Sequence, residues 1–150
     1  MKILFICTGN ACRSALAERI LDKMLSDNGI TGVEVSSCGT KFYGDLDRDE
    51  TMCRIAVEHG YFMGGKAVLM DEALLNSADL IIVMTEHHRD EVTRVLRYDN
   101  WNRIVRFNNY CFGEPTDLPD PHFQTEYVYR KCFDTIERGC AKIIDKLNEL

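Results

Sequence analysis

Long apolar runs are absent from the sequence. No stretch approaches the roughly 20 consecutive apolar residues that a membrane helix requires, so we expect no membrane span and no membrane partner. The N-terminal apolar segment, residues 3–7, is also shorter than the roughly 7–15 residues of a secretory signal core. We therefore expect no signal peptide in this sequence.

Basic residues are fewer than acidic residues in this sequence. The 150 residues include 18 Lys and Arg against 24 Asp and Glu, which gives a formal net charge of −6 at pH 7. A protein that binds nucleic acid through the phosphate backbone needs a basic face, so we expect no nucleic-acid partner. The acidity indicates little more, because many enzymes share it.

Closely spaced metal ligands are also missing. Neither Cys7 and Cys12 nor Cys132 and Cys140 have the two-residue spacing of a zinc knuckle, and the four histidines are scattered. We therefore expect no metal and no other cofactor. The seven cysteines are an odd number in a chain that is 45% hydrophobic, which favours free thiols in a reducing cytoplasm over a disulfide framework.

Apolar residues are sufficient for one hydrophobic core. A chain of 150 residues is long enough to close one ordinary core and too short to close two comfortably, so we expect a single domain over residues 1–150. Short apolar runs alternate with segments in which apolar residues recur every three or four positions. This alternation predicts an α/β fold, with a four-stranded parallel sheet and helices on both of its faces.

The expected elements follow from these periods. The predicted strands are residues 2–7, 33–37, 80–84 and 104–107. The predicted helices are residues 14–27, a helix capped by Asp47 or Asp49 that ends at Gly60, residues 71–76, residues 86–96, and a C-terminal helix with apolar positions from 129 to 147. We expect His87 and His88 on a solvated helix face, and Cys53, Cys132 and Cys140 in the core.

The segment after the first predicted strand has the residues of a phosphate site. A loop that curls around a helix N-terminus points backbone N–H groups inward, and with the helix dipole these bind a phosphate or another oxyanion. Gly9 and Asn10 tolerate the backbone conformations that such curling needs. The expected phosphate-binding residues are Thr8, Gly9, Asn10, Ala11, Cys12, Arg13 and Ser14.

Three side chains of this segment fit phosphoryl transfer. A helix N-terminus and a neighbouring arginine favour the thiolate of Cys7, which can attack phosphorus. Arg13 offers a planar fork that grips two phosphate oxygens, and Ser14 is placed to donate to the cysteine sulfur. The loop is not a nucleotide-binding P-loop, because it lacks the Gly-Lys-Ser/Thr ending and begins with a nucleophile.

A proline-rich loop supplies the candidate acid. All three prolines lie within residues 115–121, after the fourth predicted strand, where the carboxyl ends of parallel strands place functional residues. Asp120 stands between two of these prolines and is expected to protonate the leaving oxygen, with Asp117 as the alternative. Asp120 by itself fits a role in a turn or a helix cap as well as it fits catalysis, so the pairing with residues 7–14 is what favours catalysis.

The sequence resembles the low molecular weight protein-tyrosine phosphatases over essentially its whole length. The resemblance rests on residues 7–14 with the following Ala17 and Glu18, on Ser37 to Gly39, on Ala78 to Met84, and on Asp120-Pro121. It implies a metal-free enzyme that hydrolyses phosphotyrosine in phosphorylated proteins through a cysteinyl-phosphate, with the nucleophile, clamp and acid named above.

The resemblance also implies roles for two further loop residues. Asn10 is expected to hold the loop in shape. Cys12 is expected to trap oxidised Cys7 as a disulfide, which would make it the redox partner of the nucleophile. Thr85 stands where eukaryotic members commonly have Asp, which indicates a bacterial-type member.

Substrate choice remains open between two phosphorylated side chains. Ala11 stands where tyrosine-selective members have a larger aliphatic residue and where related arginine phosphatases have Thr, so a protein arginine phosphatase is the alternative. A thioredoxin-coupled arsenate reductase is a weaker alternative, because the two further cysteines that it needs near residues 80–90 are missing.

Aromatic residues on two loops are the expected walls of the pocket. Tyr43, with Phe42 as its alternative, follows the second strand and can stack on a phenyl ring for roughly 0.5–1.5 kcal/mol beyond area burial. His122 or Phe123, beside Asp120, is expected to form the opposite wall. These walls favour phosphotyrosine over phosphoserine, whose phosphate lies closer to its backbone.

Overall fold

One parallel sheet organises the computed structural model, which describes all of residues 1–150. Its strands are β1 (Lys2–Cys7), β2 (Glu34–Gly39), β3 (Leu80–Val83) and β4 (Ile104–Arg106), in the order β2-β1-β3-β4. β1 is central, since Ile3 pairs with Val35 of β2 on one side and with Leu80 of β3 on the other. The predicted α/β fold with a four-stranded parallel sheet is therefore confirmed.

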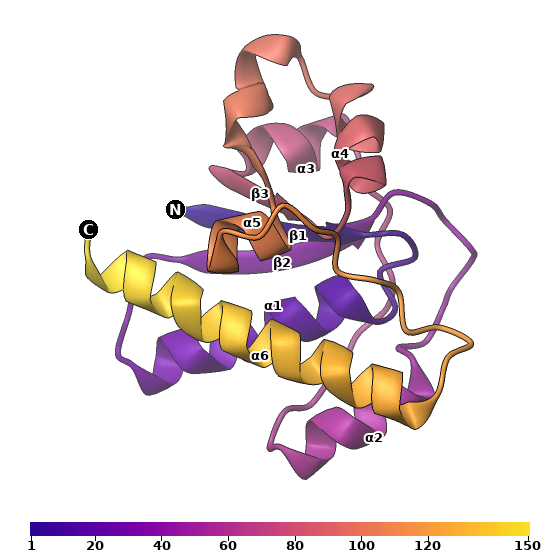
Figure 1. The fold of residues 1–150 in the computed structure, drawn as a ribbon. Helices are drawn as coiled ribbons and strands as arrows, with labels where there is room; N and C mark the ends of the chain where they lie inside the picture. The colour runs from indigo at the N-terminus through magenta and orange to yellow at the C-terminus, as the bar shows by residue number, and fades with distance from the viewer.

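Helices cover both faces of this sheet. They are α1 (Arg13–Asp27), α2 (Glu50–Glu58), α3 (Glu72–Ser77), α4 (Glu86–Thr93), α5 (Phe107–Phe112) and α6 (Glu126–Asn148), with a 3-10 helix η1 (Tyr98–Arg103). Figure 1 shows α1, α2 and α6 on one face of the sheet and α3 and α4 on the other. None of these helices is long and apolar enough to cross a membrane.

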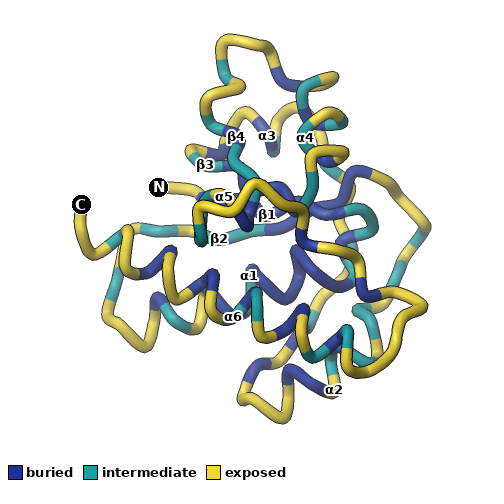
Figure 2. Tube along the Cα trace, in the orientation of Figure 1, coloured by how far each residue is buried: buried dark blue, intermediate teal, exposed yellow.

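The sheet separates two hydrophobic clusters. Because successive strand residues point to opposite faces, β1 sends Ile3 and Phe5 into the larger cluster, and Leu4 and Ile6 into the smaller one. The larger cluster packs β1 against α1, α2, α5 and α6, and the smaller one packs it against α3 and α4. In Figure 2 the trace of β1 is coloured as buried after its first residue. Burial on both faces explains the continuous run of apolar residues in this strand.

Two segments after β3 differ from the sequence prediction. Phe107, expected at the end of the fourth strand, instead begins α5, which the sequence analysis missed. The buried Asn108 anchors this helix, since its Nδ2 donates to Thr116 Oγ1 and to the carbonyl of Asp117 at 3.1 Å each. The helix expected over residues 86–96 ends at Thr93, because the chain turns there into η1.

The cysteine predictions hold in two of three positions. Cys132 and Cys140 are buried in α6, as expected, whereas Cys53 of α2 is only half-buried. Gly139, on the same face of α6, lies so close to α5 that an added Cβ would stand 2.3 Å from Cζ of Phe107. The glycine that weakens this helix in isolation therefore permits the close contact between α5 and α6.

Candidate active site

The loop between β1 and α1 forms an open ring of backbone donors. None of the N–H groups of residues 8–12 donates a hydrogen bond to another group of the protein, whereas the carbonyls face outward. Thr40 N, Lys41 N and Asp49 N donate to the carbonyls of residues 7, 8 and 11 at 3.0, 3.0 and 2.8 Å. The free donors surround the start of α1, where the helix dipole also favours an anion.

Asn10 holds this loop from behind. It has φ of 55°, in the left-handed region, and its side chain is fully buried. Its Nδ2 donates to Ser14 Oγ at 2.8 Å and to Ser37 Oγ at 2.9 Å, and Ser37 donates in turn to Glu18 at 2.7 Å. The amide thus connects the loop to both α1 and β2.

The sulfur of Cys7 lies at the end of this hydrogen-bond chain. Ser14 Oγ is 2.9 Å from Cys7 Sγ. Because Asn10 donates to Ser14, the hydroxyl proton of Ser14 is left for the sulfur or for the carbonyl of Cys38 at 3.4 Å. The sulfur is the nearer of the two, so the arrangement can stabilise a thiolate there.

Arg13 and Asp120 meet at the pocket. The guanidinium of Arg13 is buried, donates to the carbonyl of Leu118 at 2.8 Å, and lies 3.7 Å from the half-exposed carboxylate of Asp120. Asp117, the alternative acid, instead accepts from the backbone N–H of Glu86 and pairs with Arg106, each at 3.0 Å. Of the two candidate acids, only Asp120 lines the pocket.

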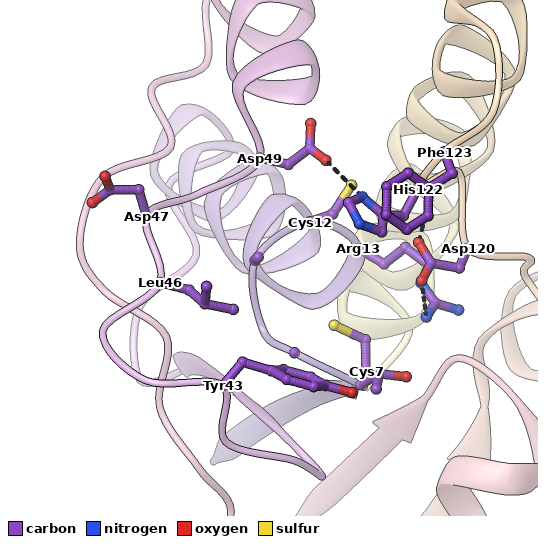
Figure 3. Close-up of a pocket in the computed structure, with 13 residues that line it drawn as sticks. Cys7, Cys12, Arg13, Tyr43, Leu46, Asp47, Asp49, Asp120, His122 and Phe123 are labelled. Atoms are coloured by element: carbon purple, nitrogen blue, oxygen red, sulfur yellow. Dashed lines mark hydrogen bonds and ion pairs between the residues drawn. The ribbon is translucent and has the colours of Figure 1, made fainter.

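The pocket has a volume of about 550 Å³ and three sides. Its base is the loop of residues 7–13, one side is the segment from Tyr43 to Asp49, and the other is the segment from Asp120 to Phe123. In Figure 3, Tyr43 lies on one side of the pocket and His122 and Phe123 lie on the other. Phe42, the alternative to Tyr43, is exposed and does not line the pocket.

This geometry agrees with comparisons to known proteins. A family model described as low molecular weight phosphotyrosine protein phosphatase matches residues 2–150. The chain belongs to this family. Low molecular weight protein-tyrosine-phosphatase PtpB of Staphylococcus haemolyticus is 34% identical over 136 residues, which cover 91% of this chain and 92% of the relative.

Two other comparisons bear on the activity of this phosphatase. The protein-arginine-phosphatase of Bacillus subtilis is 25% identical over 150 residues, covering 99% of this chain and 98% of the relative. Among solved structures, a protein tyrosine phosphatase of Entamoeba histolytica, with Hepes in its active site, has a TM-score of 0.91 and 26% identity. The match covers 99% of this chain and 97% of that one. The family therefore contains relatives named for two different substrates.

The sequence analysis of this phosphatase missed a histidine behind the loop. His88 of α4, expected on a solvated face, is buried and lies 2.8 Å from Thr8 Oγ1 through Nε2. Burial and then the nearby Arg13 lower the pKa of His88 from 6.5 to about 4, so its ring is neutral at pH 7. His87 is exposed, as expected. The two histidines differ because α4 turns one side chain toward the sheet.

Asp49 is a second residue whose position in the pocket was not predicted. As expected for a helix cap, it accepts from Met52 N, at 3.0 Å. Its other oxygen accepts from the hydroxyl of Tyr129 at 2.7 Å and faces His122 across 4.0 Å. The same carboxylate lines the pocket, so the cap of α2 also shapes the site.

Cys12 lies on the pocket lining but is almost fully buried. Burial raises its pKa well above the usual value for a thiol, with a smaller contribution from the nearby Cys132. Cys12 is therefore a neutral thiol at pH 7.

The structure contains no cluster of three or more His, Cys, Asp or Glu side chains arranged to hold a metal ion.

Proposed function

We propose that this member of the family hydrolyses phosphotyrosine in proteins, with Cys7 as nucleophile, Arg13 as phosphate clamp and Asp120 as general acid. The observation that carries the proposal is the position of Cys7 Sγ. It lies at the base of the pocket, 2.9 Å from Ser14 Oγ and below a ring of free N–H groups. A phosphate held by that ring would present its phosphorus to the sulfur.

The reaction proceeds in two displacements at phosphorus. In the first, the thiolate of Cys7 forms an S–P bond while the P–O bond to the tyrosine breaks, and Asp120 gives its proton to the departing oxygen. In the second, Asp120 takes a proton from water, which attacks the cysteinyl-phosphate and releases inorganic phosphate and the thiolate. Ser14 stabilises the departing thiolate, and Arg13 follows the phosphate oxygens through both steps.

The walls support an aromatic substrate. Tyr43 is more than half exposed at the pocket edge, and the rings of His122 and Phe123 are 3.9 Å apart on the opposite side. A phenyl ring between these walls could stack on either of them. The phosphate of phosphoserine would not reach the loop without drawing the peptide backbone into the pocket.

A specific observation also favours phosphoarginine as a second candidate substrate. The Asp49 carboxylate lines the pocket and is held in place by Met52 N and the Tyr129 hydroxyl. A carboxylate has room for further donors, and a phosphorylated guanidinium offers N–H groups where a phenyl ring has none. A relative named protein-arginine-phosphatase also supports phosphoarginine as the second candidate.

We also propose a cytoplasmic location and redox protection through Cys12. All seven cysteines are free thiols, which accords with a reducing compartment. Peroxide would oxidise the Cys7 thiolate to a sulfenic acid. The sulfur of Cys12 would then attack the sulfenic sulfur and form a disulfide, while the proton of Cys12 leaves with the sulfenic hydroxyl as water. Both residues line the same pocket, which supports this pairing.

A rate comparison tests the substrate. We expect phosphotyrosine peptides to be hydrolysed with a higher kcat/KM than phosphoarginine peptides of the same sequence, whereas Cys7→Ser should lose turnover and still bind phosphate or vanadate. A faster reaction on phosphoarginine would make the second candidate the correct one. Residual turnover by Cys7→Ser would remove Cys7 from its role.

A further inference from the structure

Arg48 contacts the loop of residues 7–13, which we call the phosphate loop, from outside the pocket. This arginine precedes the cap of α2, and its Nη1 donates both to the backbone carbonyl of Asn10 and, at 3.2 Å, to Asn10 Oδ1. Its Nε donates to the carbonyl of Gly64 at 3.0 Å. One guanidinium therefore joins the loop to the segment from Tyr43 to Asp49, to which Arg48 belongs, and to residues 62–68.

The contacts of Asn10 show why this guanidinium matters. The two protons of Nδ2 go to Ser14 and Ser37, and Oδ1 accepts from the backbone N–H of Val68 at 2.9 Å as well as from Arg48. Left-handed backbone costs free energy at residues other than glycine, although less at asparagine than at most others, and contacts with the surroundings offset this cost. Arg48 binds both the backbone and the side chain of the one loop residue in that conformation.

The guanidinium lies against the backbone of Gly64 and Gly65. Gly65 has φ of 82°, and a Cβ added there would stand 3.4 Å from Nη2 of Arg48, an ordinary van der Waals contact. Arg48 is half-buried, and burial lowers its pKa without removing its charge, since guanidinium groups stay protonated in proteins. A partly buried cation with three hydrogen bonds to the protein is a fixed feature of the site.

We propose that Arg48 is a positioning residue of the phosphatase reaction, which holds Asn10 in its left-handed conformation and polarises the Asn10–Ala11 peptide toward bound phosphate. The proposal rests on the proposed function. The carbonyl of Asn10 and the N–H of Ala11 belong to the same peptide group and point in opposite directions. A cation on the carbonyl therefore strengthens the N–H as a donor to an oxyanion in the pocket, where Ala11 lies.

The test compares Arg48→Met and Arg48→Lys with wild type. In Arg48→Met we expect the inhibition constants of phosphate and vanadate to rise by about tenfold, because the N–H of Ala11 becomes a weaker donor to the oxyanion and Asn10 is held less firmly. The kcat/KM for p-nitrophenyl phosphate should fall at least as far. Arg48→Lys keeps the charge without the planar fork, so its constants should lie between the other two. Arg54→Met is the matched control, because Arg54 is a half-exposed arginine of α2 that pairs with Glu58 and Glu126.

The inhibition constants separate positioning from a general loss of stability. If Arg48 only stabilised the fold, its loss would reduce the amount of active protein and leave the inhibition constants of the folded fraction unchanged. Constants within about twofold of wild type in Arg48→Met would overturn the proposal. If Arg48→Met does not fold, the same result in Arg48→Gln, which also removes the charge, would overturn it.

The same measurements distinguish this proposal from the proposed function. Phosphate binding is also measured by calorimetry, which needs no turnover. An inactive wild type would refute the phosphatase function, and weaker phosphate binding by the variants would still support Arg48. An active wild type with unchanged binding in both variants would refute the role of Arg48 alone.

Discussion

Substituting Ser14 by Ala tests the stabilisation of the Cys7 sulfur. Ser14 is fully buried, its Oγ lies 2.9 Å from Cys7 Sγ, and it accepts from Asn10. The change removes the donor to the thiolate but leaves Arg13 and Asp120 in place. Asn10 loses one of the two acceptors of its Nδ2 and keeps the other, Ser37.

The magnitude follows from the kind of hydrogen bond that is lost. A hydrogen bond to a charged group contributes about 1.5–3 kcal/mol, which corresponds to roughly 10- to 100-fold in rate when it acts on the transition state. In the proposed mechanism the thiolate is the leaving group of the second displacement, so hydrolysis of the cysteinyl-phosphate should slow by this factor. In Ser14→Ala the intermediate should accumulate, and kcat and KM should fall together.

Rapid-mixing kinetics with p-nitrophenyl phosphate measure this effect. Ser14→Ala should release a burst of nitrophenolate close to one equivalent of enzyme, followed by a slow steady state. Ser36→Ala on β2 is the control, since Ser36 makes no side-chain hydrogen bond and should behave as wild type. A variant of Ser14 with kcat within about twofold of wild type would refute the reasoning.

Three further predictions concern the acid, the core and pH. Asp120→Asn should slow aryl phosphates with poor leaving groups by about 10²–10⁴-fold and those with good leaving groups less, and equal slowing across the series would exclude Asp120 as the acid. Gly139→Ala should lower the free energy of unfolding, measured in urea, by about 1–3 kcal/mol, because the new Cβ meets Phe107; a more stable variant would contradict this. The pKa of His88 is about 4 when folded and 6.5 when unfolded, so the unfolded chain binds the proton first as pH falls. The free energy of unfolding should therefore drop by up to roughly 3 kcal/mol between about pH 6.5 and pH 4, and an equal pH dependence in His88→Gln would contradict this assignment.

Local features of the chain were accessible to sequence reasoning. The proposed nucleophile Cys7, the proposed clamp Arg13 and Ser14 lie within residues 7–14, where the strand, the turn and the helix follow directly from apolar spacing. The continuous apolar run of β1 also indicated burial on both faces, because successive strand residues point to opposite faces of the sheet. The error at Phe107 arose because an apolar residue after a short strand can either continue the strand or begin a helix. In the structure Phe107 begins a helix, where it packs against Phe5 and Gly139.

The sequence by itself thus determined the fold class, the candidate phosphate-binding loop and the residue types that could carry the chemistry. The tertiary structure decided which distant residues meet that loop. Thr8 and His88 are separated by 80 positions, and Arg48 reaches Asn10 across 38. It also placed Asp120, rather than Asp117, in the pocket. Such contacts depend on how strands and loops pack in three dimensions, and no periodicity along the chain encodes them. In the sequence, His88 and Arg48 have the features of ordinary surface side chains.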